Sequence, residues 1–287
     1  MADLNSNIDW NYVDKTLEMA LHEDIGSGDI TTSSLIPKKH VSSSLLIAKD
    51  NFILAGLPFS ERVFKLVDSG IKFKSLAKEG GKIRSGTVIA EIKGKTKSLL
   101  MGERTALNLL QRLSGIATLT AKYSAAVKGT GARIVDTRKT VPCLRFFDKY
   151  AVRTGGGSNH RFGLFDGVLI KDNHIAAVGG VGKAVRIARD RAHHLVKIEV
   201  EVKNLREVRE ALSARADIIM LDNMTAATTK KAVELIRRKN KDVLIEASGN
   251  INLENVREIA ENGVDLISVG ALTHSVPAAD ISMKFDF

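Results

Sequence analysis

Cysteine and aromatic residues are scarce in this chain. Its 287 residues include one cysteine, Cys143, and aromatic side chains make up 5% of the total. A lone cysteine excludes an intramolecular disulfide and a metal site built from several thiolates. Proteins that bind single-stranded nucleic acid stack the bases on aromatic rings, so the shortage of rings argues against that class. The formal net charge of +10 therefore favours a small polyanionic substrate, with nucleic-acid binding as the alternative.

Long apolar runs are missing as well. No stretch approaches the roughly 20 apolar residues that cross a bilayer, and segment 1–15 carries acids where a secretory signal has basic and then apolar residues. We therefore expect a cytoplasmic protein that binds neither membranes nor nucleic acid. Hydrophobic residues at 44% and charged residues at 26% are ordinary for a globular protein, which excludes a disordered chain.

From about residue 130 onward, short runs rich in Val and Ile alternate with amphipathic helical patterns. The candidate strands are 132–139, 165–172, 196–202, 216–223, 243–250 and 264–272, and the candidate helices between them are 182–194, 205–216, 228–239 and 252–263. This alternation predicts an α/β barrel of parallel strands with helices outside. Asn223 and Asn250–Asn252 are expected to cap two of the helices.

The first third of the chain has a different pattern. We expect a helix near 10–22, a Gly/Ser/Thr-rich turn over 24–37, short strands within 42–56 and 71–94, and a long helix over 98–127. These elements predict a separate N-terminal α/β sandwich at residues 1–115, followed by an open-barrel domain at residues 116–287. A C-terminal helix could return to the first domain.

Polar and charged residues mark the end of each candidate barrel strand. They are Asp136, Arg138, Lys139, Lys171, Asp172, Glu199, Glu201, Asp222, Asn223, Glu246, Ser248, Gly249, Asn250 and Gly270. The carboxyl ends of parallel barrel strands open on one face, which carries the active site. Within the third strand, Glu199 and Glu201 share a face by alternation, so both are expected to point into the mouth.

The cations that can reach this mouth indicate the chemistry of its ligand. They are Arg138, Lys139, His160, Arg161 and Lys171, with Arg104 from the long helix as a further candidate. Arginine binds carboxylate or phosphate through paired hydrogen bonds, and lysine supplies a point charge. Together they predict a substrate with several carboxylate and phosphate groups.

Two acids and two glycine-rich turns complete the predicted site. Glu201 and Asp222 suit Mg²⁺ or sugar hydroxyls, because Mg²⁺ prefers one or two carboxylates plus phosphate oxygens. The alternative is that they neutralise nearby lysines. The turns ASGN and SVGA, at 247–250 and 268–271, suit phosphate binding, or are ordinary turns after a strand.

Six segments carry motifs that are specific in combination. They are ERTALNLLQRLSGIATLT, DTRKTVPCLRFFDKYAVRTGGGSNHRFGLFDGVLIKDNH, IEVEV, MLDN, IEASGN and ISVGALTHS. Together they resemble quinolinate phosphoribosyltransferase, a family also called nicotinate-nucleotide pyrophosphorylase (carboxylating). The resemblance runs from EDIGSGDITT, which starts at residue 23, to the C-terminus, and no position of the motifs departs from the family pattern.

The resemblance implies a reaction, a cofactor and an assembly. Quinolinate and phosphoribosyl pyrophosphate give nicotinate mononucleotide, pyrophosphate and CO₂, with Mg²⁺ accompanying the pyrophosphate in NAD biosynthesis. The family works as a homodimer in which one subunit's N-terminal domain covers the partner's barrel mouth.

The resemblance also implies a role for each site residue. Quinolinate is bound by Arg104 from the neighbouring subunit and by Arg138, Lys139, His160, Arg161 and Lys171. Phosphate is bound by Ser248, Gly249, Asn250 and Gly270. Glu201 and Asp222 face the ribose and metal, directly or through water, and we assign catalysis to Lys139, Lys171, Glu201 and Asp222.

Other activities stay open at this point. Lys171 at a strand end would suit a Schiff-base aldolase, and a nicotinate phosphoribosyltransferase would share the architecture while taking a monocarboxylate. The hairpin pattern over 79–94 is similar to a lipoyl carrier but lacks a lysine centred in its tight turn.

Overall fold

The structure, a computed structural model, describes residues 8–286 and confirms the mixed α/β class. It divides into two compact units. The first comprises the described residues up to Leu119, the insertion Val141–Gly156 and the described residues from Ser275 onward; the second comprises Thr120–Thr140 and Gly157–His274. The first unit includes two segments that come later in the sequence, so a single domain boundary does not separate the two units.

An antiparallel four-stranded sheet forms the base of the first unit. Its order is β12 (Ile281–Asp286), β1 (Val41–Ala48), β5 (Val88–Lys95) and β3 (Lys72–Ser75). Every second residue of β1 is buried, as expected for a sheet with one covered face. The C-terminal segment thus returns to this unit as a strand paired with β1, and not as a helix.

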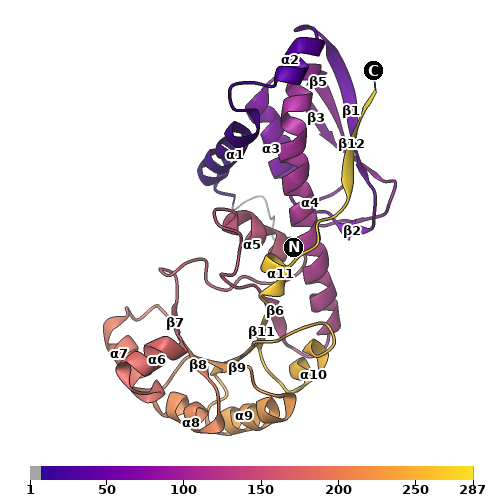
Figure 1. Cartoon of the computed structure of the whole chain (residues 1–287). Helices are drawn as coiled ribbons and strands as arrows, with labels where there is room; N and C mark the ends of the chain where they lie inside the picture. The colour runs from indigo at the N-terminus through magenta and orange to yellow at the C-terminus, as the bar shows by residue number, and fades with distance from the viewer. Residues whose placement is uncertain (1–7, 287) are drawn as a thin grey trace. The chain divides into compact units, whose positions relative to one another are not determined.

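Helices complete the first unit. They are α1 (Trp10–Ile25), α2 (Ile30–Leu35), α3 (Leu57–Val67), α5 (Arg145–Thr154) and the first part of α4 (Thr96–Ala126), and the short strands β2 (Phe52–Ile53) and β4 (Lys82–Ile83) form a separate pair. Helices α3 and α4 lie on the same side of the sheet (Figure 1). The turn expected over 24–37 is wrong in part, because it contains α2, whose first turn is capped by the Asp29 carboxylate accepting from the Thr32 N–H at 2.8 Å.

A parallel six-stranded sheet forms the second unit. Its order is β6 (Arg133–Val135), β11 (Leu266–Ser268), β10 (Leu244–Ser248), β9 (Ile218–Asp222), β8 (Ile198–Val202) and β7 (Val168–Ile170). All neighbouring strands run parallel, and β6 and β7 are the two edges, so the barrel is open. The six predicted strands are confirmed.

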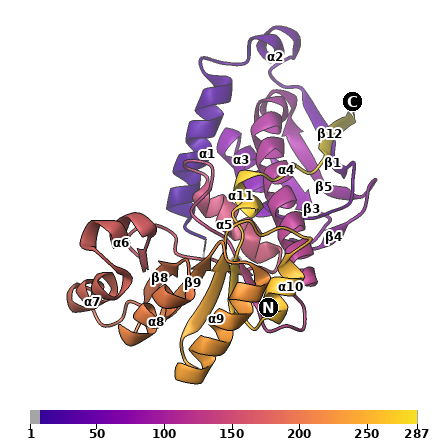
Figure 2. The same cartoon turned by 60° about the horizontal axis from the view of Figure 1, so that its bottom comes forward.

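The helices of the second unit connect these strands. They are α6 (Asp172–Val178), α7 (Val181–Arg191), α8 (Leu205–Ser213), α9 (Ala226–Lys239), α10 (Val256–Glu261) and α11 (Ala271–His274). Figure 2 shows α8 and α9 alongside the strands, on the outer side of the sheet. Among the described residues, no helix is both long and apolar enough to cross a membrane.

The expected helix cap at Asn223 is wrong. Helix α9 is capped by Thr225, whose hydroxyl accepts from the Thr228 N–H, and Asn223 lies two residues earlier with a left-handed φ of 53°. Before α10, the Asn252 side chain accepts from two backbone N–H groups, whereas Asn250 also has a φ of 53°. Asn223 and Asn250 therefore serve the strand ends and not the helices.

Alternation along β8 positions the interior acids. All five residues of this strand are buried. Ile198, Val200 and Val202 share one face and Glu199 and Glu201 the other, since neighbouring side chains on a strand point to opposite sides. The apolar face packs against the outer helices, so the two glutamates point into the barrel, as the sequence predicts.

Candidate active site

A cavity of about 680 Å³ opens at the carboxyl ends of the parallel strands of the second unit. All the site residues predicted from the sequence line this cavity, except Arg104. Those that line it are Arg138, Lys139, His160, Arg161, Lys171, Glu201, Asp222, Ser248, Gly249, Asn250 and Gly270. Arg104 lies on α4 in the first unit, where it is exposed.

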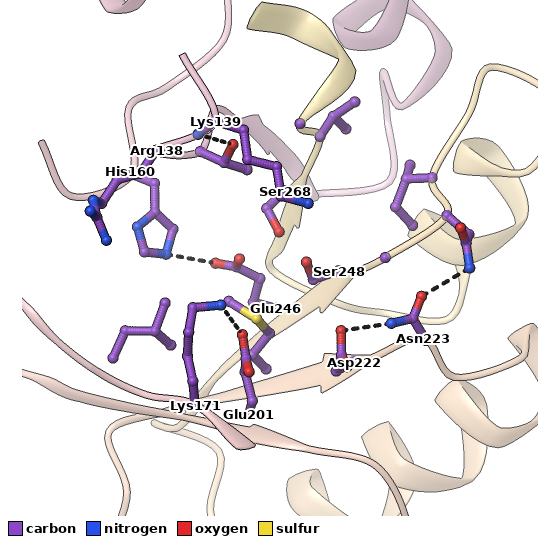
Figure 3. A pocket seen from close by; sticks show the side chains of 18 of the residues that line it. Arg138, Lys139, His160, Lys171, Glu201, Asp222, Asn223, Glu246, Ser248 and Ser268 are labelled. Carbon is purple, nitrogen blue, oxygen red and sulfur yellow. Dashed lines mark hydrogen bonds and ion pairs between the residues drawn. The ribbon is translucent and has the colours of Figure 1, made fainter. Parts of the chain in front are cut away.

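Lys171 and Glu201 form an ion pair on one wall. Lys171 follows β7 at the start of α6, and its Nζ lies 2.5 Å from Oε1 of Glu201 on the neighbouring strand β8 (Figure 3). The Lys171 side chain is 48% exposed, whereas that of Glu201 is 10% exposed. The ammonium group is therefore held at the solvent side of a nearly buried carboxylate, where it can contact a ligand.

Hydrogen bonds at both ring nitrogens define the state of His160. The Arg161 backbone N–H donates to Nδ1 at 2.8 Å, so Nδ1 carries no proton. The proton of the neutral ring then lies on Nε2, which is 3.0 Å from Glu199 Oε2 and donates to it. The Asp136 carboxylate holds the segment in place by accepting from the His160 backbone N–H at 2.9 Å.

Two buried carboxylates lie beneath His160. Glu246 on β10 is 0% exposed and Glu199 is 4% exposed. Burial and the negative charge of Glu199 raise the pKa of Glu246 to about 8. In the part of the chain that the structure describes, Glu199 Oε1 and both carboxylate oxygens of Glu246 lack a hydrogen bond of normal length, and His160 Nε2 lies 3.7 Å from Glu246 Oε2 (Figure 3). A proton held by Glu246 relieves the repulsion between the two acids.

Arg161 brings a partly desolvated cation to the cavity. Its Nη1 donates to the Gly167 carbonyl at 3.0 Å, while its buried Nε has no partner among the described residues. Burial and the neighbouring Arg138 lower the pKa of Arg161. Two guanidinium groups that repel each other in a cavity favour an anion between them.

Tight turns close the other side of the cavity. A Cβ added to Gly270 would lie 3.2 Å from the side chain of Lys139, so the glycine gives that lysine room to pass. Gly249 follows β10 with a left-handed φ of 91°. Both glycines line the cavity, where backbone N–H groups are open to a ligand.

The acids of the cavity differ in their fitness for a metal ion. Glu201 and Asp222 line the same cavity, and two carboxylates that share an open space with substrate phosphates are a common Mg²⁺ arrangement. The group formed by His160, Glu199 and Glu246 is compact, with ligand atoms within 4.8 Å of one another. A metal on Nε2 would need the ring proton on Nδ1, which instead accepts from the Arg161 N–H, so this group fits hydrogen bonding better.

The structure adds residues to which the sequence analysis gave no individual role in the site. Ser268 and His274 line the cavity, as does Glu246, which the sequence placed at a strand end without a role. Ser268 and Gly270 are two positions apart at the end of β11, and Glu246 and Ser248 have the same spacing on β10. The period of two would have identified Ser268 and Glu246, whereas no local pattern marks His274.

An open α/β barrel that gathers arginine and lysine around acids at the carboxyl ends of its strands belongs to the barrel enzymes that act on polyanionic substrates. Family models narrow this class. The model described as quinolinate phosphoribosyl transferase, N-terminal domain, matches residues 29–114, and that of the C-terminal domain matches residues 116–284. The chain belongs to the quinolinate phosphoribosyltransferase family.

Relatives and solved structures agree with this family. The chain is 47% identical over 275 residues to the probable nicotinate-nucleotide pyrophosphorylase (carboxylating) of Synechocystis sp., covering 96% of this chain and 93% of that protein. It is 45% identical to the protein of the same description from Bacillus subtilis, over 94% of this chain and 92% of that one. The crystal structure of NadC from Streptococcus pyogenes matches at a TM-score of 0.92 and 44% identity, covering 97% of each chain.

Proposed function

We propose that the cavity of the second unit is the site where this chain makes nicotinate mononucleotide. The enzyme transfers a phosphoribosyl group from phosphoribosyl pyrophosphate to quinolinate, with release of pyrophosphate and CO₂, in NAD biosynthesis. The observation that carries the placement is the convergence of Arg138, Lys139, Arg161 and Lys171 on one cavity that also holds Glu201 and Asp222. Substrates with carboxylates, phosphates and ribose hydroxyls match this mixture of charges.

Quinolinate is assigned to the side of the cavity lined by the two arginines. Arg138 and Arg161 bind its two carboxylates, with Lys139 and His160 beside them, and the unpartnered Nε of Arg161 is available for such a contact. Lys171 lies between this side and the acids and orients the ring nitrogen toward the ribose. A dicarboxylate uses both guanidinium groups, which favours quinolinate over nicotinate.

Phosphoribosyl pyrophosphate is assigned to the opposite side. Ser248, Gly249, Asn250 and Gly270 surround its 5′-phosphate, and Glu201 and Asp222 face the ribose hydroxyls. Mg²⁺, when bound, neutralises the pyrophosphate and so stabilises it as a leaving group. Glu201 and Asp222 are the residues that would hold this ion, directly or through water.

The reaction on these residues needs no protein nucleophile. The pyridine nitrogen attacks the anomeric carbon as pyrophosphate leaves, and Glu201 and Asp222 stabilise the positive charge that develops on the ribose. Loss of CO₂ then leaves an electron pair on the ring carbon next to the positively charged nitrogen, and that carbon takes up a proton. Lys171 is engaged by Glu201 as an ion pair, whereas an aldolase would need its free amine.

A carbon-labelled substrate tests this function directly. Quinolinate labelled in the carboxylate that is lost should release labelled CO₂ only when phosphoribosyl pyrophosphate and Mg²⁺ are both present. Nicotinate in its place should give no mononucleotide, and borohydride should trap no covalent adduct at Lys171. Product formation from nicotinate at the same rate would contradict the assignment of quinolinate.

Arg104 is assigned to the active site of a second copy of the chain. Its exposed position on α4 and the family motif ERTALN support this role, and a two-fold dimer would give each cavity one such arginine. Mixing Arg104→Ala protein with Lys171→Ala protein should restore part of the activity, since one heterodimer site is then intact. No recovery in verified heterodimers would contradict the shared site. The cytoplasmic location expected from the sequence stays a prediction.

A further inference from the structure

A chain of two asparagine amides leads from the Ser248–Asn250 turn to Asp222. The Asn250 side-chain NH₂ donates to Oδ1 of Asn223 at 2.9 Å, and the Asn223 NH₂ donates to Oδ1 of Asp222 at 2.9 Å. Figure 3 shows the Asn223 and Asp222 side chains next to each other, joined by a dashed line. The turn and the acid are therefore joined by direct hydrogen bonds, although β9 and β10 supply them separately.

The backbone holds both amides in place. Asn223 and Asn250 each have a φ of 53°, a left-handed conformation that asparagine tolerates better than most residues. The Asn223 N–H donates to the Ser248 carbonyl at 2.8 Å, which extends the parallel pairing of the two strands by one residue. The Asn255 side chain anchors the turn by donating to the Asn250 carbonyl at 2.9 Å.

Gly249 is shaped around the Asn223 amide. A Cβ on Gly249 would lie 2.2 Å from Oδ1 of Asn223, which is far inside contact distance. Only glycine at this position leaves the amide where it is. Glycine is therefore required here for more than the turn conformation. Any larger residue would displace the Asn223 side chain, which donates to Asp222.

The hydrogen bond from Asn223 orients Asp222 through a neutral donor. The amide is neutral and engages only Oδ1, and Oδ2 has no hydrogen-bond partner among the residues that the structure describes. Glu201 differs, because a lysine ammonium pairs with it directly. Asp222 is thus aligned by a neutral amide, whereas Glu201 is aligned by a direct contact with a lysine.

We infer that Asn223 is a positioning residue for the phosphoribosyl side of the reaction. It fixes the Asp222 carboxylate relative to the Ser248–Asn250 turn, so that the acid and the proposed phosphate cradle form one rigid wall. The inference rests on the proposed function, which places ribose and phosphate on this wall. Substitution of Asn223 should therefore weaken the binding of phosphoribosyl pyrophosphate and leave quinolinate binding nearly unchanged.

The variant Asn223→Asp removes the hydrogen bond to Asp222 with the least change of shape. Aspartate has almost the same shape and also tolerates a left-handed φ, and its oxygen can still accept from Asn250. It loses the N–H donor and places a second carboxylate beside Asp222. We expect the KM for phosphoribosyl pyrophosphate to rise about ten-fold or more, as for the loss of a hydrogen bond to a charged group, while the KM for quinolinate changes less than about two-fold.

Three further variants complete the experiment. Asn240→Asp is the matched control, since it adds the same charge at an exposed position after α9 and should leave both KM values unchanged. Asn223→Gly keeps the left-handed backbone and removes both amide bonds, so it replaces Asn223→Asp should that protein fail to fold. Asp222→Asn reports on the acid itself, and calorimetry of phosphoribosyl pyrophosphate with Mg²⁺ gives its binding apart from catalysis.

The outcomes separate the two claims. A selective loss of phosphoribosyl pyrophosphate binding in Asp222→Asn and in the uncharged Asn223→Gly, with or without a further loss in Asn223→Asp, supports the inference. A loss in Asp222→Asn but not in the Asn223 variants overturns the positioning role and leaves the proposed function intact. Wild-type binding in Asp222→Asn overturns the placement of ribose, and the inference with it. Equal rises in both KM values would reveal general damage and also overturn the positioning role.

Discussion

Both units of this protein bury carboxylates, but they treat them differently. In the first unit, Glu79 accepts from two backbone N–H groups at the start of α3 and from the Tyr150 hydroxyl, and Asp148 accepts two hydrogen bonds from Arg112. In the second unit, Glu246 has neither oxygen hydrogen-bonded to a described residue. Burial raises the pKa of all three acids; of the three, Glu246 is the one that lacks dedicated hydrogen-bond donors.

The difference separates a structural use of buried charge from a functional one. An acid with a full set of partners ties elements together, as the half-buried Glu79 ties α3 to the segment before β4 and the buried Asp148 ties α5 to α4. A buried acid without a close hydrogen-bond donor costs stability. Glu246 has such a position at the floor of a ligand cavity, with His160 Nε2 3.7 Å from its Oε2, which indicates a role toward His160 and the substrate. Four variants, taken from the largest expected effect to the smallest, test this distinction.

Asp148→Ala should destabilise the protein most. It leaves the Arg112 guanidinium, 23% exposed, without its bidentate partner, and breaking a buried pair from one side costs about 3–5 kcal/mol. The free energy of unfolding in urea measures the loss, and the KM values of the folded fraction should not change. The double variant Arg112→Ala/Asp148→Ala is the control and should recover part of the stability. An Asp148→Ala protein as stable as the wild type would show that the pair is not structural.

Arg161→Lys should weaken the binding of quinolinate and leave the stability of the protein nearly unchanged. Lysine keeps the positive charge but cannot form two parallel hydrogen bonds to a carboxylate. The loss of such a desolvated bidentate contact costs roughly 2–5 kcal/mol of quinolinate affinity. The dissociation constant of quinolinate measures this loss, while the urea midpoint should stay near that of the wild type. Arg138→Lys is the companion variant. If both variants bind quinolinate as tightly as the wild type, the two arginines do not form its pocket.

Glu246→Gln should change how stability depends on pH. The pKa of Glu246 is raised from an ordinary 4.5 to about 8 in the folded protein, so its neutral form is favoured on folding. The stabilisation is complete below pH 4.5 and is lost as pH rises toward 8, with a slope of up to about 1.4 kcal/mol per pH unit. Glutamine is neutral at every pH. As pH rises from 5 to 8, the free energy of unfolding measured in urea should therefore fall in the wild type relative to the variant. Parallel stability curves would mean that Glu246 is charged in the folded state.

Much of the second unit was predictable from the sequence. Its strands and most of its helices carry strong local periodicity, and parallel strands place their carboxyl ends on one face, so Lys171, Glu201 and Asp222 could be assigned to one cavity before the fold was known. The hydrogen-bond partners of individual side chains were harder to predict from the sequence. The cap expected at Asn223 was wrong because its amide is engaged by Asp222 and Asn250, the latter 27 residues away.

Long-range pairing limited the prediction of the first unit. Strand β12 pairs with β1 across more than 230 residues, from Ser43 opposite Asp286 to Ala48 opposite Ile281. Neither segment signals that partner locally, so the helix expected at the C-terminus was wrong. The α2 helix was missed because its stability comes from the single cap at Asp29 and not from an apolar face.

Arg206→Ala should have the smallest effect and tests whether burial, rather than charge alone, distinguishes these acids. Arg206 on α8 lies 3.7 Å from Glu210 one turn later, and its side chain is 81% exposed. Solvent screens such a pair, and holding two long side chains together costs entropy, so the loss should be about 0–1 kcal/mol. Urea unfolding at low and high salt measures it, with Glu210→Gln as the matched variant for the other partner. A loss comparable to that of Asp148→Ala would show that paired charge stabilises this protein regardless of burial, and the contrast between the two units would then need another cause.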